Sequence, residues 1–448
     1  KNITDSKIDW LGEVPNEWKV VKLKYALADV PYPIVDGPFG TQLKADEYTD
    51  SGVPLVRISN LDFKGNLTLE DIKFISEQKA LEIQRSRIKL NDIIIGKTGA
   101  TIGKSGLNDK IEYGIVSSSC LKISVDENKL LPLFFRYYVT SANFQNIILQ
   151  TASGSTRDTI NITPMANIEV VIPTLEEQIK IVQYLDHQTT IIDQLIQQKE
   201  KLIELLKEKR QAVINEAVTK GLNPNARMKE SRIEWLGEVP NDWKVTKLKF
   251  LAKLNPSKSE IEKKIDGEDF VSFLPMEKVE ENWSYDKNSS AKFSTVSSGL
   301  TYFKEGDIIM AKITPCFENG KAAILENLIN GFGFGSTEFH TIRPLKVDKR
   351  YLFYVTRSDY FMSNGESFMT GSAGQKRVPT SFVSDFYVPV PKPKEQIEIA
   401  GFIENYISKN NKISNELELQ ILKLKEYRQS IISEAVTGKI DVRDWQMN

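Results

Sequence analysis

Apolar residues follow a heptad spacing in two long stretches of the chain. Between Thr174 and Gly221 there is neither glycine nor proline, and Thr174 with Glu177 is typical of the capping box that begins a helix. A helix of ~40 residues would be ~60 Å long, and a stripe this narrow needs a partner helix. Because the stretch after Glu395 has the same spacing, we expect the two helices to pair with each other. The expected contact residues are Leu185, Ile192, Ile196, Ile203, Leu206, Ile403, Ile407, Leu417, Ile421 and Leu424. A helix buried within one domain is the alternative, but such helices seldom exceed about 25 residues.

Shorter apolar runs occur in the region before each helix. They are bounded by glycine, proline, asparagine or aspartate, which is typical of strands. The predicted strands are Val53–Ile58, Asp92–Ile95, Cys120–Val125, Glu169–Ile172, Asp307–Met310, Phe339–Ile342 and Phe386–Val390, and the predicted short helices are Leu131–Thr140 and Tyr351–Phe361. Each region, which we call a body, has ~150 residues and is large enough for its own core. The predicted fold class is therefore α+β.

The chain also repeats itself. Residues 7–25 and 232–250 are identical at 14 of 19 positions, at an offset of 225. The repeats Glu177-Gln178-Ile179 with Glu395-Gln396-Ile397, and Glu216-Ala217-Val218-Thr219 with Glu434-Ala435-Val436-Thr437, both have an offset of 218. The helical stretches are thus equal in length, whereas the bodies differ. The one echo between the bodies is Asp92-Ile93-Ile94 with Lys97 against Asp307-Ile308-Ile309 with Lys312.

This pattern indicates a duplication followed by divergence of the bodies. Its period is too long for a solenoid and predicts two domains. We divide the chain into a first body at residues 1–173, a central helix at 174–222, a second body at 223–392, and a second helix with a tail at 393–448.

Composition excludes several classes of protein. Hydrophobic residues are 40% and charged residues 27%, which are ordinary values for a globular protein. No apolar run approaches the ~18 residues of a membrane-spanning helix, and the polar start of the chain shows no secretory signal. Two cysteines, Cys120 and Cys316, cannot make a disulfide framework or a four-cysteine zinc site. We therefore expect a cytoplasmic protein. The 59 basic and 60 acidic residues nearly cancel, so any nucleic-acid binding depends on charges gathered on one face.

Catalytic patterns are weak. Gly99-Ala100-Thr101-Ile102-Gly103-Lys104-Ser105 has three residues between its glycines, where a phosphate-binding loop needs four. The two histidines, His187 and His340, have no metal-ligand spacing around them. We therefore expect no active site, no metal and no cofactor in this chain.

The Trp-Leu-Gly-Glu-Val-Pro openings at residues 10–15 and 235–240, the segment Gly37–Lys44 and the Glu-Ala-Val-Thr helix ends together resemble the DNA-specificity subunit of type I restriction-modification systems. The resemblance covers essentially the whole chain. It implies that each body is a target-recognition domain, and that the helices form an antiparallel coiled coil with pseudo-two-fold symmetry. It also implies a subunit without its own active site, which directs two methyltransferase subunits, acting on adenine N6, and restriction-translocase subunits to double-stranded DNA. S-adenosylmethionine, ATP and Mg would then be bound by those partners.

Two recognition domains of different sequence should read two different half-sites, so the expected target is bipartite and asymmetric. Loops with arginine, lysine, glutamine or threonine are suited to base and phosphate contacts. The candidate DNA-binding residues are Gln42, Lys44, Arg57, Lys97, Thr98, Thr101, Lys104, Ser155, Thr156, Arg157, Lys312, Thr314, Lys321, Gln375, Lys376 and Arg377.

The repeated tryptophans Trp10, Trp18, Trp235 and Trp243 could stack on bases. Because residues that read different half-sites should differ, we interpret these identical copies as packing residues near the helix pair. Within the family, the same architecture could serve methylation only, without a nuclease partner. Two other functions also stay open. One is a coiled-coil scaffold for protein interactions, which the neutral charge favours. The other is a nucleotide-binding enzyme that uses the Gly99–Ser105 loop.

Overall fold

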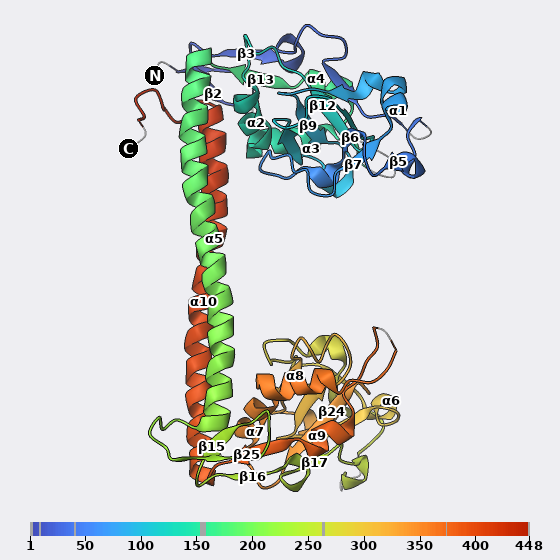
Figure 1. The fold of residues 1–448 in the computed structure, drawn as a ribbon, viewed down its shortest axis with the longest axis vertical. Coiled ribbons are helices and arrows are strands. Elements are labelled where there is room, and N and C mark those ends of the chain that lie inside the picture. The colour runs from blue at the N-terminus through green and yellow to red at the C-terminus, as the bar shows by residue number, and fades with distance from the viewer. Residues whose placement is uncertain are drawn as a thin grey trace. The chain divides into compact units, whose positions relative to one another are not determined.

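A computed structural model describes residues 3–8, 10–39, 42–152, 158–261, 265–372 and 374–446 (Figure 1). The chain divides into two compact units. Unit 1 comprises Lys1–Glu200 with Glu418–Asn448, and unit 2 comprises Lys201–Leu417. Each unit therefore combines one body with a segment of both long helices, whereas the sequence division placed each helix in a part of its own.

The body of unit 1 contains two main sheets. One has the order β10-β9-β12-β4 and the other the order β5-β7-β6-β11-β8, and two-stranded sheets β1-β2 and β13-β3 complete the unit. Its strands are β1 (Ile3–Asp5), β2 (Glu13–Pro15), β3 (Lys19–Lys22), β4 (Ile34–Asp36), β5 (Tyr48–Thr49), β6 (Val53–Val56), β7 (Lys73–Ile75), β8 (Arg87–Ile88), β9 (Ile93–Gly96), β10 (Ser105–Leu107), β11 (Gly114–Val116), β12 (Cys120–Ile123) and β13 (Glu169–Ile172). Its helices are α1 (Glu77–Glu82), α2 (Pro132–Thr140), α3 (Ala142–Thr151), α4 (Ile162–Ala166) and the first part of α5 (Leu175–Lys220).

Unit 2 repeats this topology, except that its second sheet has four strands among the described residues where that of unit 1 has five, although the bodies lack an obvious sequence alignment. Its main sheets have the orders β22-β21-β24-β17 and β19-β18-β23-β20, with two-stranded sheets β14-β15 and β16-β25. Its strands are β14 (Met228–Glu230), β15 (Glu238–Pro240), β16 (Lys244–Lys247), β17 (Ala252–Leu254), β18 (Phe270–Leu274), β19 (Ser290–Lys292), β20 (Thr301–Lys304), β21 (Ile308–Ala311), β22 (Ala322–Ile324), β23 (Phe332–Gly335), β24 (Phe339–Pro344) and β25 (Tyr387–Val390). Its helices are α6 (Phe293–Val296), α7 (Lys349–Thr356), α8 (Asp359–Ser367), α9 (Thr380–Asp385) and the first part of α10 (Pro393–Val436).

The echo between the bodies reflects one strand pair with the same register in each unit. Ile93 of β9 pairs with Ile123 of β12, and Ile308 of β21 pairs with Ile342 of β24. Both central strands are fully buried, which explains their continuous apolar sequence. In each unit the second sheet also has one parallel pair, β6 with β11 and β18 with β23.

The two long helices form as the heptad spacing predicts. In unit 1, Arg428 Nε lies 3.1 Å from Asp193 Oδ1, and Lys199 Nζ lies 2.6 Å from Gln420 Oε1. Along these contacts the residue numbers rise on α5 while they fall on α10, so the two segments run antiparallel (Figure 1). In unit 2, Asn410 Nδ2 donates to the Leu206 carbonyl oxygen at 3.1 Å. All ten positions expected at the contact are buried or half-buried.

A tryptophan fixes the start of each long helix. Trp18 Nε1 donates to Glu177 Oε2, and Trp243 Nε1 donates to Glu395 Oε1, each at 3.1 Å. Both indoles are buried. Glu177 also belongs to the predicted capping box, because its amide donates to Thr174 Oγ1 at 3.3 Å. These contacts are within the protein, in agreement with our interpretation of Trp18 and Trp243 as packing residues.

The glutamine that follows each glutamate connects the helix to its body. Gln178 Oε1 accepts from the Leu131 amide, and Gln396 Oε1 accepts from the Asp348 amide, each at 2.7 Å. Leu131 and Asp348 are the residues just before α2 and α7. Both glutamine side chains are nearly inaccessible to solvent, so the body helix and the long helix begin at a shared buried hydrogen bond.

One predicted element is wrong. The segment Tyr351–Phe361 was expected to be one helix, but the structure has two, α7 and α8, separated at Arg357 and Ser358. The Ser358 hydroxyl accepts from the Phe361 amide at 3.3 Å and caps α8. Serine at this position favours a new helix start over continuation. The capping signal was therefore in the sequence, but the apolar spacing masked it.

Replacing Trp243 with alanine should lower the unfolding free energy of unit 2 by about 3–5 kcal/mol, since it empties a fully buried site. Trp243→Phe should cost less, about 1–3 kcal/mol, because it keeps most of the packing and loses the hydrogen bond to a carboxylate. Urea unfolding followed by circular dichroism measures both. Equal losses for the two variants would show that the hydrogen bond dominates and packing does not.

Candidate nucleic-acid interface

In unit 1, the candidate loops meet at the end of β9. The Ile160 amide donates to the Lys97 carbonyl oxygen at 2.9 Å, and the Gly99 amide donates to that of Asp158 at 3.0 Å. Asp36, directly before the Gly37–Lys44 segment, accepts from Lys97 Nζ at 2.7 Å. Three segments that are far apart in the sequence therefore share one end of the sheet. The candidates Ser155, Thr156 and Arg157 lie outside the described residues.

In unit 2, the corresponding loops meet in the same way at the end of β21. The Val378 amide donates to the Lys312 carbonyl oxygen at 2.8 Å, and the Lys312 amide donates to that of Glu338 at 2.9 Å. The Thr314 amide donates to the Lys376 carbonyl oxygen at 3.0 Å. Ile160 and Val378 differ by 218 positions, the offset of the long helices. The fold thus builds one kind of loop surface twice.

The candidate residues differ in how well a ligand could reach them. The exposed ones are Gln42, Lys44, Gln375 and Lys376. The half-buried ones are Arg57, Thr98, Thr101, Lys104, Lys312, Thr314, Lys321 and Arg377. Five of the half-buried residues already make internal hydrogen bonds: Arg57 to the Asp71 carbonyl oxygen, Thr101 to that of Thr98, Thr314 to that of Lys376, Lys321 to that of Met276, and Arg377 to the Glu338 carboxylate.

Lys97 is a correction to the candidate set. Its side chain is 3% exposed, pairs with Asp36 and lies 4.3 Å from the centroid of the Phe39 ring. Removal of either partner of such a buried pair would leave an uncompensated charge, so we assign Lys97 to the structure of the loop and not to DNA contact. Sequence reasoning gave Lys97 a contact role and overlooked Asp36, because nothing in the sequence pairs residues 61 positions apart.

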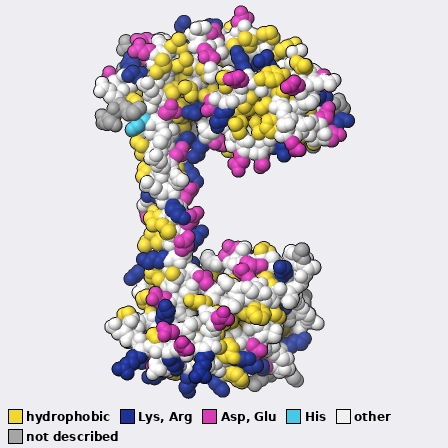
Figure 2. Space-filling model, in the orientation of Figure 1, with side chains coloured by type: hydrophobic (Ala, Val, Ile, Leu, Met, Phe, Trp, Pro, Cys, Tyr) yellow, Lys and Arg dark blue, Asp and Glu magenta, His cyan; other side chains and the backbone are white. Residues whose placement is uncertain are grey.

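Arg377 and Glu338 form a fork-shaped ion pair on the surface of unit 2. Two guanidinium nitrogens of Arg377 each lie 2.9 Å from a Glu338 carboxylate oxygen. The hydrogen bond from Arg377 lowers the pKa of Glu338. The pair is neutral overall, so the exposed Lys376 is the cation more available for a phosphate. On the face shown in Figure 2, basic and acidic side chains are interspersed over both units, in keeping with the net charge of −1.

His340 lies beneath the loop of unit 2 and was not recognised as a candidate. It is 2% exposed, and its Nε2 lies 2.9 Å from the Val378 carbonyl oxygen. Burial lowers the pKa of His340 below its ordinary value of 6.5. The sequence around His340 indicates only a strand. It could not predict this contact, because Val378 is 38 positions away.

Since the pKa of His340 is lower in the folded protein, the unfolded chain binds more protons below pH 6.5. The stability that neutral His340 contributes is present above pH 6.5 and is lost as the pH falls. Between pH 7.5 and 5.5 the wild-type chain should lose more unfolding free energy than His340→Asn, by up to about 1.4 kcal/mol for each pH unit below 6.5. Urea titrations of both proteins at each pH measure this difference. Parallel losses in the two proteins would contradict it.

In the part of the chain that the structure describes, no helix is both long enough and apolar enough to cross a membrane. Within the same ranges, no group of three or more histidine, cysteine, aspartate or glutamate side chains is arranged to hold a metal ion.

Comparison with known proteins identifies relatives of the chain. The EcoEI specificity subunit of a type I restriction enzyme from Escherichia coli is 39% identical over 199 residues, which is 44% of this chain and 32% of that protein. The EcoAI specificity subunit matches to a similar extent, so the chain aligns with about a third of the length of these two relatives. The putative MjaX specificity subunit of Methanocaldococcus jannaschii is 24% identical and covers 97% of this chain and 96% of its own.

Solved structures share the fold. A chain from a structure that describes complex assembly and conformational transition of the type I R-M system has a TM-score of 0.68 at 15% identity, and covers 95% of this chain and 99% of that chain. The HsdS subunit from Thermoanaerobacter tengcongensis has a TM-score of 0.53 at 15% identity, with 95% and 98% covered.

The profile of one family matches both halves of the chain. This family, described as the type I restriction modification DNA specificity domain, matches residues 15–205 and 240–423. Each match spans a body and part of the helix that follows it. The chain therefore belongs to the type I restriction-modification DNA specificity family.

Proposed function

We propose that this chain is the sequence-specific DNA-recognition subunit of a type I restriction-modification complex. The observation that carries the proposal is the loop surface built twice on one sheet framework, at the ends of β9 and β21, with different side chains in each copy. Two recognition domains with the same backbone fold and different side chains suit a DNA site that is bipartite and asymmetric.

The chain would act by placing partners rather than by chemistry of its own. It would direct two adenine-N6 methyltransferase subunits, and restriction-translocase subunits, to the site that it reads. S-adenosylmethionine, ATP and Mg would be bound by those partners. The relatives, all named as specificity subunits, support this assignment. The protein-interaction scaffold rests only on the neutral net charge, and the family match weighs against it.

The nucleotide-binding reading of the Gly99–Ser105 loop loses support in the structure. Gly99–Thr101 forms a single 3-10 turn, and Ser105 already begins β10, where it pairs with Ile95. A phosphate-binding loop would lead into a helix whose first amides face the phosphate. This loop leads into a strand instead.

Methylome sequencing of a host that expresses this chain with its neighbouring methyltransferase gene tests the proposal. We expect new N6-methyladenine at one split motif with two different halves. If the methyltransferase is active and bound to this chain, yet no new motif appears, the proposal is wrong.

Lys376 provides a residue-level test in the complex with the methyltransferase. Because Lys376 is exposed beside the Arg377–Glu338 pair, we expect it to contact a phosphate. Lys376→Ala should weaken binding to target and scrambled DNA by the same factor, and should reduce the slope of log affinity against log salt by about 1. Fluorescence anisotropy over a salt series measures this slope.

The matched control is Lys292→Ala, which removes a lysine of β19 already paired with Glu268 at 2.6 Å. This variant should leave the salt slope unchanged. Loss of discrimination at one base pair in Lys376→Ala would instead assign Lys376 to base reading and contradict the phosphate contact.

A further inference from the structure

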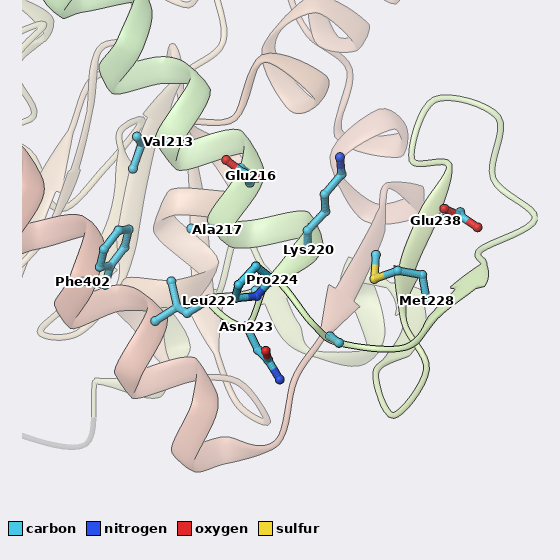
Figure 3. A pocket seen from close by; sticks show the side chains of 12 residues that line it. Val213, Glu216, Ala217, Lys220, Leu222, Asn223, Pro224, Met228, Glu238 and Phe402 are labelled. Carbon is cyan, nitrogen blue, oxygen red and sulfur yellow. The ribbon is translucent and has the colours of Figure 1, made fainter.

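A cavity of about 500 Å³ opens past the end of α5 in unit 2 (Figure 3). Phe402 of α10 and Leu222, just past α5, lie on one side of it, and Met228 and Glu238 of the β14–β15 hairpin lie on the other. This volume is within the range of ligand-binding pockets. The cavity is separate from the loop surface that we assign to DNA, since none of the candidate DNA-binding residues lines it.

The cavity leaves large apolar side chains uncovered. Phe402 is 46% exposed and Leu222 is 41% exposed. Single exposed apolar residues are common, but these two converge on one cavity. Glu216, Lys220 and Glu238 are exposed and line the same cavity, so its wall is apolar and its edge is charged.

The internal repeat shows what covers the corresponding position in unit 1. Tyr184 of α5 corresponds to Phe402 at the offset of 218. Trp445, in the segment after α10, packs edge-on against Tyr184 with ring centroids 5.6 Å apart, and its ring lies 5.5 Å from that of His187. In unit 1, the aromatic ring of Tyr184 on the long helix is therefore covered by the indole of Trp445 from the same chain.

Unit 2 has no indole at the corresponding position. Counted from Gly438 and Gly221, the positive-φ glycines that follow the two long helices, the residue that corresponds to Trp445 is Met228, which lines the cavity but has no aromatic ring. The segment after α5 continues directly into β14, whereas Trp445 lies in the segment after the last helix. Both units thus have an aromatic residue on the long helix, Tyr184 or Phe402, but among the described residues only unit 1 has an indole, that of Trp445, packed against it.

The lining of the cavity also suits an indole chemically. This chain holds two buried indoles, Trp18 and Trp243, by an apolar wall and a hydrogen bond from Nε1 to a glutamate. The cavity offers a similar set of groups, with Phe402, Leu222 and Met228 as the wall and the exposed Glu216 or Glu238 as acceptor. We propose that this cavity binds the indole side chain of a tryptophan presented by a partner protein. The proposal does not depend on the DNA-recognition function.

The probe is N-acetyl-tryptophanamide, titrated into the full-length chain carrying ¹³C-labelled methionine methyl groups. Met228 is the methionine that lines the cavity. Ring-current shifts should move the Met228 resonance and leave that of Met310, in the core of unit 2, in place. N-acetyl-leucinamide should give a weaker effect, because it lacks both the ring and the N–H donor.

Phe402→Ala should weaken the binding by about two- to tenfold, the loss expected for one aromatic contact. Phe402 is half exposed, so this variant should fold. Phe270→Ala is the matched control, because Phe270 is 53% exposed on β18 and does not line the cavity. An unmoved Met228 resonance, or equal effects of the two amides, would overturn the proposal.

A second copy of this chain is the competing source of the indole. Sedimentation of the wild-type chain and of Trp445→Ala over a concentration series distinguishes the two. A monomer in both cases supports a partner protein. A wild-type dimer that Trp445→Ala dissociates would assign the cavity to the second copy and overturn the proposed partner.

Discussion

The hydrogen bond between an indole and a glutamate at the start of each long helix holds the unit together. Trp18 with Glu177, and Trp243 with Glu395, connect the opening of each half to its helix. The neighbouring Gln178 and Gln396 connect the same turn to the body. The end of the other helix packs here as well, because a Cβ at Gly438 would lie 3.0 Å from the Trp18 ring and one at Gly221 would lie 3.0 Å from the Trp243 ring. Both glycines have a positive φ, so a side chain at either position would also be strained.

This arrangement separates what is constant in the chain from what varies. The opening, the helix starts and the helix ends are repeated nearly unchanged, because each takes part in the same buried contacts. The bodies keep the sheet order and the strand register, which the apolar faces of β9 and β21 fix, but their loops are free to differ. A recognition protein needs this division, since its specificity can then change without loss of the frame that positions it.

Sequence reasoning was strongest where a local pattern sets the structure. The heptad stripe predicted α5 and α10, and the repeat predicted two domains. It was weakest where the structure depends on distant contacts. The shared topology of the bodies was visible only in the Asp92 and Asp307 segments. The buried Lys97–Asp36 pair, the His340 contact and the Trp445 cover depend on residues brought together by the fold, and no spacing along the chain reveals them.

We conclude that the repeated opening and the repeated helix start hold the body in the same way in both halves, so that the two bodies are interchangeable. Exchange of residues 26–168 with residues 251–386 tests it most directly, because both segments lie between a repeated opening and a repeated helix start. Leu23 donates to the Ile168 carbonyl oxygen as Leu248 donates to that of Phe386, each through its amide, so the boundaries correspond. Methylome sequencing of the exchanged chain with its methyltransferase should give the same split motif as the original. The reason is that each body would be held by a repeated opening and helix start equivalent to its own. A different motif from a folded, methyltransferase-bound chain would contradict the account.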